Sequence, residues 1–194
     1  MQVERIIAGV TTLGPGERVC IWVNGCSRRC EGCVSPELQS PKPENECDIL
    51  RVLEKFNLGP RDGVTVSGGE PFEQVSALTA LVRYLRERGV EDLLVYTGYT
   101  LEELERRADG EPDVRYLLDN IGVLIDGPYI REQDDGRGNL AGSKNQRVLY
   151  LNESLKPKYA AYASETRTVQ EFFMFPHLVG VGIPTAEYIK KFRQ

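Results

Sequence analysis

Three short apolar runs in the middle of the chain each end in a glycine-containing turn, and helical segments lie between them. The runs are residues 63–66, 92–96 and 121–125, and they lead into Ser67-Gly68-Gly69-Glu70-Pro71, Thr97-Gly98-Tyr99 and Asp126-Gly127-Pro128. Alternating strands and helices are typical of a parallel sheet with helical crossovers. Because functional groups in such folds gather at the carboxyl ends of the strands, we expect the three turns to share one edge of the sheet.

The segments around these strands show helical spacing. Residues 73–88 repeat apolar side chains every three or four positions, and Gly89 ends the pattern. Cys47 to Asn57 has a similar spacing. Thr100 with Glu103 three positions later predicts a capping box at the start of another helix.

Further strands are predicted on both sides of this region. Residues 5–12 and 17–23, separated by Gly14-Pro15-Gly16, indicate a hairpin or two successive strands. Residues 147–151 indicate another strand, and the polar, glycine-rich segment 129–145 is predicted to be a mobile loop. The last predicted elements are two strands at residues 168–174 and 178–183, joined by a turn at Pro176-His177.

These elements predict an α/β fold. There are too few strand–helix units for a full eight-unit barrel, so we expect a partial, open (β/α) barrel over residues 1–151. Residues 152–194 are expected to be a C-terminal extension that contains the β-hairpin and packs on the same domain. The 194 residues, 41% of them hydrophobic, are enough for one core.

The charge balance and cysteine content limit the class of protein. The formal net charge is −5 and no basic patch stands out, so a nucleic-acid partner is not expected. No apolar stretch approaches the roughly 18 residues of a membrane span, and the first residues do not resemble a secretory signal. We therefore expect a cytoplasmic protein, in which five reduced cysteines point to metal or redox chemistry.

Three of these cysteines are closely spaced. Cys26, Cys30 and Cys33 form a C-x3-C-x2-C pattern inside residues 24–46, called here the cysteine loop. Thiolates suit iron–sulfur clusters and zinc, and most [4Fe-4S] clusters use four of them. Three ligands would leave one iron open for a further ligand. The zinc alternative needs a fourth ligand, from Cys20, Cys47 or His177.

The other candidate ligands are less promising. Cys20 alternates with Ile21 on a predicted strand and is expected in the core. Cys47 opens a predicted helix, and His177, the single histidine, lies in a predicted turn. We expect no catalytic role for His177, and the sequence leaves the roles of Cys20 and Cys47 open.

The C-x3-C-x2-C spacing resembles the motif of the radical S-adenosylmethionine (SAM) superfamily. Ser67-Gly68-Gly69-Glu70-Pro71 resembles the segment of that family that receives the amino group of SAM. Two glycines at a strand end would let backbone carbonyls approach the ligand closely.

A narrower resemblance, over about residues 5–151, is to the anaerobic ribonucleotide reductase activating enzymes, which are glycyl radical enzyme activases. It rests on Gly14-Pro15-Gly16, Tyr96-Thr97-Gly98-Tyr99 with Leu101 and Leu104, Val123-Leu124-Ile125-Asp126-Gly127, and Gly142-Ser143-Lys144-Asn145-Gln146-Arg147. Two features depart from that family. Leu140-Ala141 stands where a Trp-Arg pair is usual, and the chain continues some 40 residues past the usual end.

The resemblance implies a cofactor set and a role for each site residue. Cys26, Cys30 and Cys33 would ligate a [4Fe-4S] cluster. SAM would lie against Gly32 and Val34 beside the last ligand, Gly68, Gly69 and Glu70 at its methionine end, and Thr97 and Asp126 on the ribose or substrate side. Asn145 and Arg147 are weaker candidates.

The implied activity is reductive cleavage of SAM to methionine and a 5′-deoxyadenosyl radical, with flavodoxin or ferredoxin as electron donor. The radical would then take a hydrogen atom from a glycyl radical enzyme such as anaerobic ribonucleotide reductase. Homolysis needs no acid–base pair, and no catalytic side chain is expected. The alternatives are a radical SAM enzyme acting on a small molecule or peptide, and a non-catalytic iron–sulfur or zinc protein.

Overall fold

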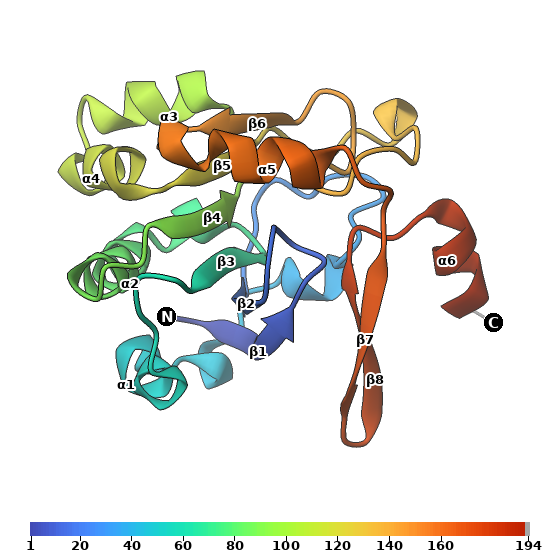
Figure 1. Ribbon diagram of the computed structural model, residues 1–194, viewed down its shortest axis with the longest axis horizontal. Helices are drawn as coiled ribbons and strands as arrows, with labels where there is room; N and C mark the ends of the chain where they lie inside the picture. Colours follow the sequence, from blue (N-terminus) through green and yellow to red (C-terminus); the bar gives the residue numbers. More distant parts are fainter. Residues whose placement is uncertain (193–194) are drawn as a thin grey trace.

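The computed structural model describes residues 1–192, which form a mixed α/β fold, as the sequence predicts (Figure 1). Among these residues, no helix is long and apolar enough to cross a membrane. The strands are β1 Val3–Val10, β2 Arg18–Val23, β3 Gly63–Gly68, β4 Asp92–Tyr96, β5 Val123–Asp126, β6 Arg147–Tyr150, β7 Val169–Met174 and β8 His177–Gly182. The α-helices are α1 Ile49–Leu53, α2 Val75–Glu87, α3 Leu101–Ala108, α4 Pro112–Asn120, α5 Lys156–Ala163 and α6 Ala186–Phe192.

The main sheet has six strands, and their order in space follows the chain from β1 to β6. The four middle strands, β2 to β5, are parallel, whereas β1 and β6 pair antiparallel to their neighbours at the two edges. The predicted parallel sheet is therefore correct for the middle of the chain. At the first edge, β1 can pair antiparallel to β2 because a turn joins the two strands directly, without a crossover helix.

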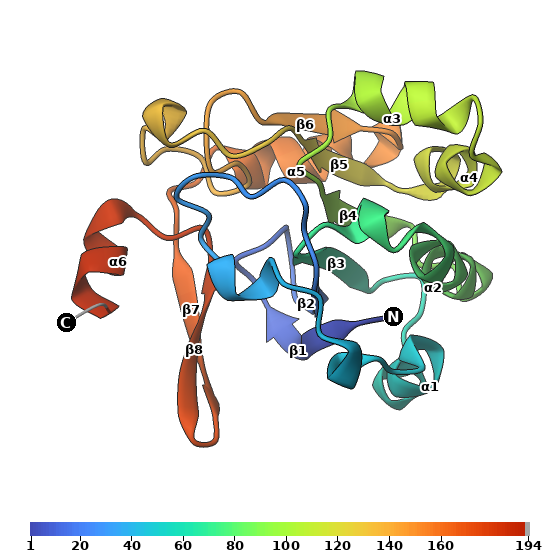
Figure 2. The same ribbon diagram turned by 180° about the vertical axis from the view of Figure 1, so that it is seen from behind.

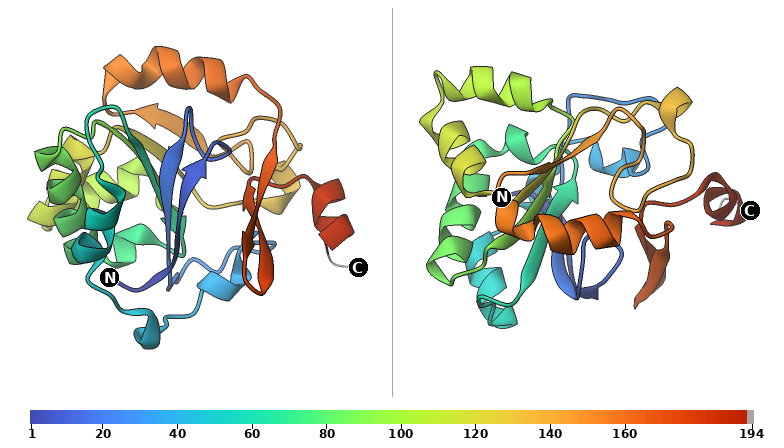
Figure 3. Two further views of the ribbon diagram at one scale, coloured as in Figure 1. Left: turned by 60° about the horizontal axis from the view of Figure 1, so that its bottom comes forward. Right: turned by 45° about the horizontal axis from the view of Figure 1, so that its top comes forward.

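The helices that follow β2, β3 and β4 all pack on one face of this sheet. Alternate strand residues such as Val64, Val66 and Leu124 share one buried cluster with side chains of α1, α2 and α4. The residues between them point the other way, because side chains alternate along a strand. Figure 3 shows the four helices α1 to α4 gathered on one side and the C-terminal hairpin on the other.

The C-terminal segments cover the opposite face of the sheet. Tyr159 and Tyr162 of α5 pack on Leu94 and other side chains of β4 and β5. The β7–β8 hairpin packs through Val181 on a separate cluster that includes Cys20. Figures 1 and 2 show α5 lying across β5 and β6, and the hairpin projecting beyond the body.

A fully buried arginine joins the two layers. Arg18 at the start of β2 donates from Nε to the Thr65 hydroxyl at 2.7 Å and forms an ion pair with Asp92 at 3.0 Å. Asp92 also accepts hydrogen bonds from the Tyr159 hydroxyl and the Lys158 ammonium of α5. Burial works to raise the pKa of Asp92, but Arg18, Lys158 and Tyr159 outweigh it and the pKa is lowered.

Most predicted elements are present, with shifted ends. The predicted helix Cys47 to Asn57 is α1 followed by a 3₁₀ turn at Glu54–Phe56, and Asp48 caps its start. The capping box of Thr100 and Glu103 is present at α3. The predicted terminal hairpin is confirmed, but its turn lies at Phe175-Pro176, and β8 starts at His177. Helices α5 and α6 were not predicted.

The prediction of a mobile loop over residues 129–145 is wrong for its second half. Asn139, Leu140 and Ser143 are buried. Arg167, from the C-terminal extension, donates hydrogen bonds to the carbonyls of residues 138, 141 and 142 at 2.9–3.1 Å. The polar composition of the loop does not predict this burial, because Arg167, which holds the loop, lies some 25 residues later in the chain.

We predict that Asp92→Asn destabilises the protein by about 3–5 kcal/mol, because it leaves the buried Arg18 guanidinium without its counter-charge. Urea unfolding followed by circular dichroism measures the change. Asp119→Asn, at an exposed position on α4, is the matched control and should stay within about 0.5 kcal/mol of the wild type. Equal effects of the two substitutions would contradict the prediction.

Candidate functional site

A pocket of about 330 Å³ lies at the carboxyl ends of β2, β3 and β4, between the cysteine loop and the C-terminal hairpin. The site residues proposed from the sequence line it, except Asp126 and the weaker candidates Asn145 and Arg147. Those that line it are Cys26, Cys30, Gly32, Cys33, Val34, Gly68, Gly69, Glu70 and Thr97. The strand-end turns therefore meet the cysteines at one edge of the sheet, as the alternation of strands and helices predicts.

The three cysteines are half-buried free thiols on one wall of this pocket. The first and second halves of the cysteine loop are held together by the amides of Gly25 and Cys26, which donate to the carbonyls of Leu38 and Gln39 at 2.8 and 2.9 Å. The Cys33 amide donates to the Cys30 carbonyl at 3.2 Å, which closes a turn between these two cysteines. The spacing thus presents three soft ligands from one short, anchored segment.

Burial is the main influence on the ionisation of two of these thiols. It raises the pKa of both Cys26 and Cys33. Backbone amides oppose the effect: those of Arg28 and Arg29 face the Cys26 sulfur, and that of Ser35 faces Cys33. Since a metal binds the thiolate, ligation at these positions must release protons.

The donor set fits an iron–sulfur cluster better than a zinc ion. No three His, Cys, Asp or Glu side chains within residues 1–192 are grouped closely enough to hold one metal ion. A [4Fe-4S] cluster is larger, and each cysteine binds a different iron, so it accepts thiols spread along a pocket wall. The proposed zinc ligands are elsewhere: Cys20 is buried in the core, and Cys47 and His177 do not line the pocket.

The two glycines at the end of β3 allow close packing of backbone on backbone. Gly68 has a φ of 108°, and side chains at Gly68 and Gly69 would collide with the backbone of Val23 and Gly25. The amides of Gly69 and Glu70 donate to the carbonyls of Val23 and Gly25, each at 2.7 Å. The glycines therefore let the end of β3 lie directly against the start of the cysteine loop.

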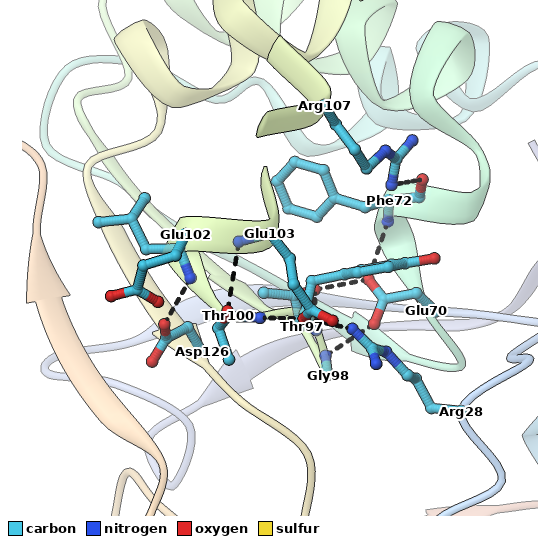
Figure 4. Close-up of polar contacts among 12 residues, drawn as sticks. Arg28, Glu70, Phe72, Thr97, Gly98, Thr100, Glu102, Glu103, Arg107 and Asp126 are labelled. Atoms are coloured by element: carbon cyan, nitrogen blue, oxygen red, sulfur yellow. Dashed lines mark hydrogen bonds and ion pairs between the residues drawn. The ribbon is translucent and has the colours of Figure 1, made fainter. Parts of the chain in front are cut away.

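The buried Glu70 carboxylate joins the ends of β3 and β4. It accepts hydrogen bonds from the Thr97 hydroxyl at 2.8 Å, the Gly98 amide at 2.7 Å and the Phe72 amide at 3.0 Å (Figure 4). Burial raises its pKa to about 7, against the three donors, which favour the ionised form. Glu70 and Thr97 thus form one polar unit that shapes the pocket wall.

Asp126 and the weaker candidates Asn145 and Arg147 lie next to the pocket but do not line it. The buried carboxylate of Asp126 accepts a hydrogen bond from the Leu101 amide at 2.7 Å, at the start of α3 (Figure 4). It also pairs with Arg147, whose guanidinium binds Glu102 at 2.8 Å as well. Its neighbour Gly127, rather than Asp126, lines the pocket.

Several pocket residues were not found from the sequence. Arg28 lies inside the cysteine pattern, where attention to charge could have found it. Tyr129 and Gln146 come from the loop held by Arg167, and residues 179–184 come from the hairpin and the segment that follows it. The hairpin residues carry no local signal for the site, since only folding brings them to it.

Comparison with protein families places this pocket in a known context. The model of the 4Fe-4S single cluster domain matches residues 12–149, which include the whole cysteine loop and strands β2 to β5. The C-terminal hairpin lies outside the matched region.

Curated relatives agree with this match. The anaerobic ribonucleoside-triphosphate reductase-activating protein of Haemophilus influenzae is 34% identical over 144 residues, covering 70% of this chain and 88% of the relative. That of Escherichia coli K12 is 31% identical over 146 residues, covering 71% and 91%. The pyruvate formate-lyase-activating enzyme of Streptococcus mutans is 26% identical over 209 residues, covering 88% and 78%. The chain therefore belongs to the 4Fe-4S single-cluster family of radical SAM activating enzymes.

Proposed function

We propose that this enzyme binds a [4Fe-4S] cluster through Cys26, Cys30 and Cys33, cleaves SAM, and generates a glycyl radical on anaerobic ribonucleotide reductase. The observation that carries the proposal is the meeting of three free thiols and the Gly68–Glu70 turn in one pocket. The names of the relatives support the reductase as the partner. A bound cluster would supply the electron that breaks the S–C5′ bond of SAM.

The roles of the other pocket residues follow from their placement. Gly32 and Val34 flank the last cysteine at the pocket surface, where they would contact SAM. Gly68 and Gly69 would offer backbone to its methionine end, while Glu70 and Thr97 would hold that turn in position without touching the reacting atoms. Asp126 would act indirectly, by fixing the start of α3 through the Leu101 amide, next to the turn in which the Gly127 amide donates to the Tyr99 carbonyl.

The fold suits this chemistry if the sheet is a partial, open (β/α) barrel. Sequential strand order, with the helices after β2 to β4 on one face, supports such a barrel, because a doubly wound sheet carries helices on both faces. We take residues 1–151 as the barrel and residues 152–192 as an extension of the same domain; the predicted extension runs to residue 194, and its last two residues lie outside the described part of the chain. The buried contacts of Tyr159 and Val181 with the sheet support the packing of the extension on the barrel.

A protein partner is supported by the exposed side chains of the extension. Phe173, Met174, Phe175 and Leu178 at the hairpin tip are 40–88% exposed. Exposed apolar patches of this kind mark interaction sites. For the electron donor we propose flavodoxin or ferredoxin, and the five free thiols suit a cytoplasmic location.

The proposed function makes a first prediction, which concerns SAM cleavage. After anaerobic reconstitution, the wild type should form 5′-deoxyadenosine from SAM and dithionite, and Cys30→Ala should fall to the protein-free background because one cluster ligand is lost. Liquid chromatography measures the product. Cys47→Ala, which removes a thiol outside the pocket, is the control and should retain activity. Equal activity of wild type and Cys30→Ala would contradict the proposal.

A second prediction concerns the partner. Mixing the reconstituted enzyme with SAM, reductant and the anaerobic ribonucleotide reductase of the same genome should give a glycyl radical doublet in the electron paramagnetic resonance spectrum. The reductase with its radical glycine replaced by alanine is the control. Active SAM cleavage without a doublet would favour a small molecule or peptide as the substrate instead.

A third prediction concerns Glu70. Its pKa of about 7 lies above the ordinary value of 4.5. The contribution of the protonated carboxyl to the free energy of unfolding is therefore complete below the ordinary value of 4.5 and is lost as the pH rises through about 7. Relative to Glu70→Gln, which cannot ionise, the wild type should lose about 2–3 kcal/mol of unfolding free energy between about pH 5 and 8. Urea titrations measure this, with exposed Glu87→Gln as control. Parallel pH profiles would refute the prediction.

A further inference from the structure

Arg28 is a charged side chain of the cysteine loop that the proposed chemistry does not use. It lies between Cys26 and Cys30 in the sequence and lines the pocket with them. Its side chain is about three-quarters buried, with 25% of its surface exposed. Burying an arginine is costly unless its charge is compensated, so we expect specific partners for this guanidinium.

The Arg28 side chain is fixed from two directions by the turn between β4 and α3. Its guanidinium carbon lies 4.1 Å from the centroid of the Tyr99 ring, in a cation–π contact. A terminal nitrogen donates to the Glu103 carboxylate, and the same carboxylate oxygen accepts from the Thr100 amide at 2.7 Å in the capping box of α3 (Figure 4). We call Arg28, Tyr99 and Glu103 the clamp.

The shape of the turn is matched to this side chain. A Cβ at Gly98 would lie 3.0 Å from Cγ of Arg28, so the absence of a side chain there leaves room for the arginine stem. The Gly98 amide is held in turn by Glu70 at 2.7 Å. The clamp therefore ties the cysteine loop to the same strand-end unit that shapes the SAM side of the pocket.

The backbone of Arg28 connects the clamp to a cluster ligand. Its amide, with that of Arg29, faces the Cys26 sulfur and favours its ionised form. Hydrogen bonds to ligand sulfurs stabilise the more negative, reduced form of an iron–sulfur cluster and so raise its reduction potential. Holding the Arg28 side chain thus holds an amide at the position where it affects the cluster.

We propose that Arg28 is a positioning residue that, through Tyr99 and Glu103, fixes the amides facing Cys26 and so raises the cluster's reduction potential. This inference rests on the proposed cluster at Cys26, Cys30 and Cys33. The proposed effect differs from a simple effect of the Arg28 charge, because it depends on the position of the amides and would be lost even if the charge of the site were unchanged.

The test uses two substitutions that conserve charge. Arg28→Lys keeps the positive charge but loses the planar, stacked guanidinium, and Tyr99→Leu removes the ring without touching the loop. Arg29→Lys, the same change at the exposed next residue, is the matched control. Each reconstituted holoprotein is titrated anaerobically with dithionite against redox mediators, and the reduced cluster is counted by electron paramagnetic resonance.

At a fixed applied potential, we expect the ratio of reduced to oxidised cluster to fall about tenfold in both clamp variants, equivalent to about 59 mV for one electron. Arg29→Lys should match the wild type. The double variant Arg28→Lys/Tyr99→Leu should fall no further than either single variant, because both disrupt one contact.

Clamp variants that match Arg29→Lys in reduction potential would overturn the proposal, as would an effect of Arg28→Lys that Tyr99→Leu does not share. If Arg28→Lys fails to fold, Tyr99→Leu alone decides, since Tyr99 lies outside the loop. Failure of the proposed function has a different result, in which the wild type itself binds no cluster.

Discussion

The buried ion pair between Arg18 and Asp92 is the interaction on which the rest of the fold depends. It joins the start of β2 to the start of β4, and Thr65 and Tyr159 extend it to β3 and α5. Taking two charges out of water is costly, and either charge alone would be costlier still. The pair therefore fixes one alignment of the parallel strands at their amino ends, and that alignment brings their carboxyl ends level at the pocket.

At the carboxyl ends the same strands are held by contacts of a different kind. Backbone lies against backbone where Gly69 meets Gly25, and the Glu70 carboxylate collects donors from the next strand end. This part of the pocket wall is therefore held by short contacts between strand ends. Such a wall suits chemistry in which the cofactors react and the protein has to position them and exclude competing reactions.

Much of this site could be predicted because it depends on local sequence patterns. The spacing of Cys26, Cys30 and Cys33 and the turn at Gly68-Gly69 identify a cluster loop and a strand end without any structure. The contact of these glycines with the backbone of Val23 and Gly25 could not be predicted, because that backbone lies more than 40 residues away in the sequence. The position of Asp126 could not be predicted for a similar reason: strand ends present adjacent residues in different directions, and its neighbour Gly127 lines the pocket.

The attachment of the C-terminal hairpin has a consequence for the order of folding. Gln170 contacts Thr11, and Val181 contacts Thr12, across 159 and 169 residues of chain. Contacts of such sequence separation pay a large loop-closure entropy until the intervening chain is compact, so they form late. We expect the cysteine loop to be assembled on a finished sheet while the hairpin is still detached, which leaves the thiols open to iron and sulfide before the last wall closes beside them.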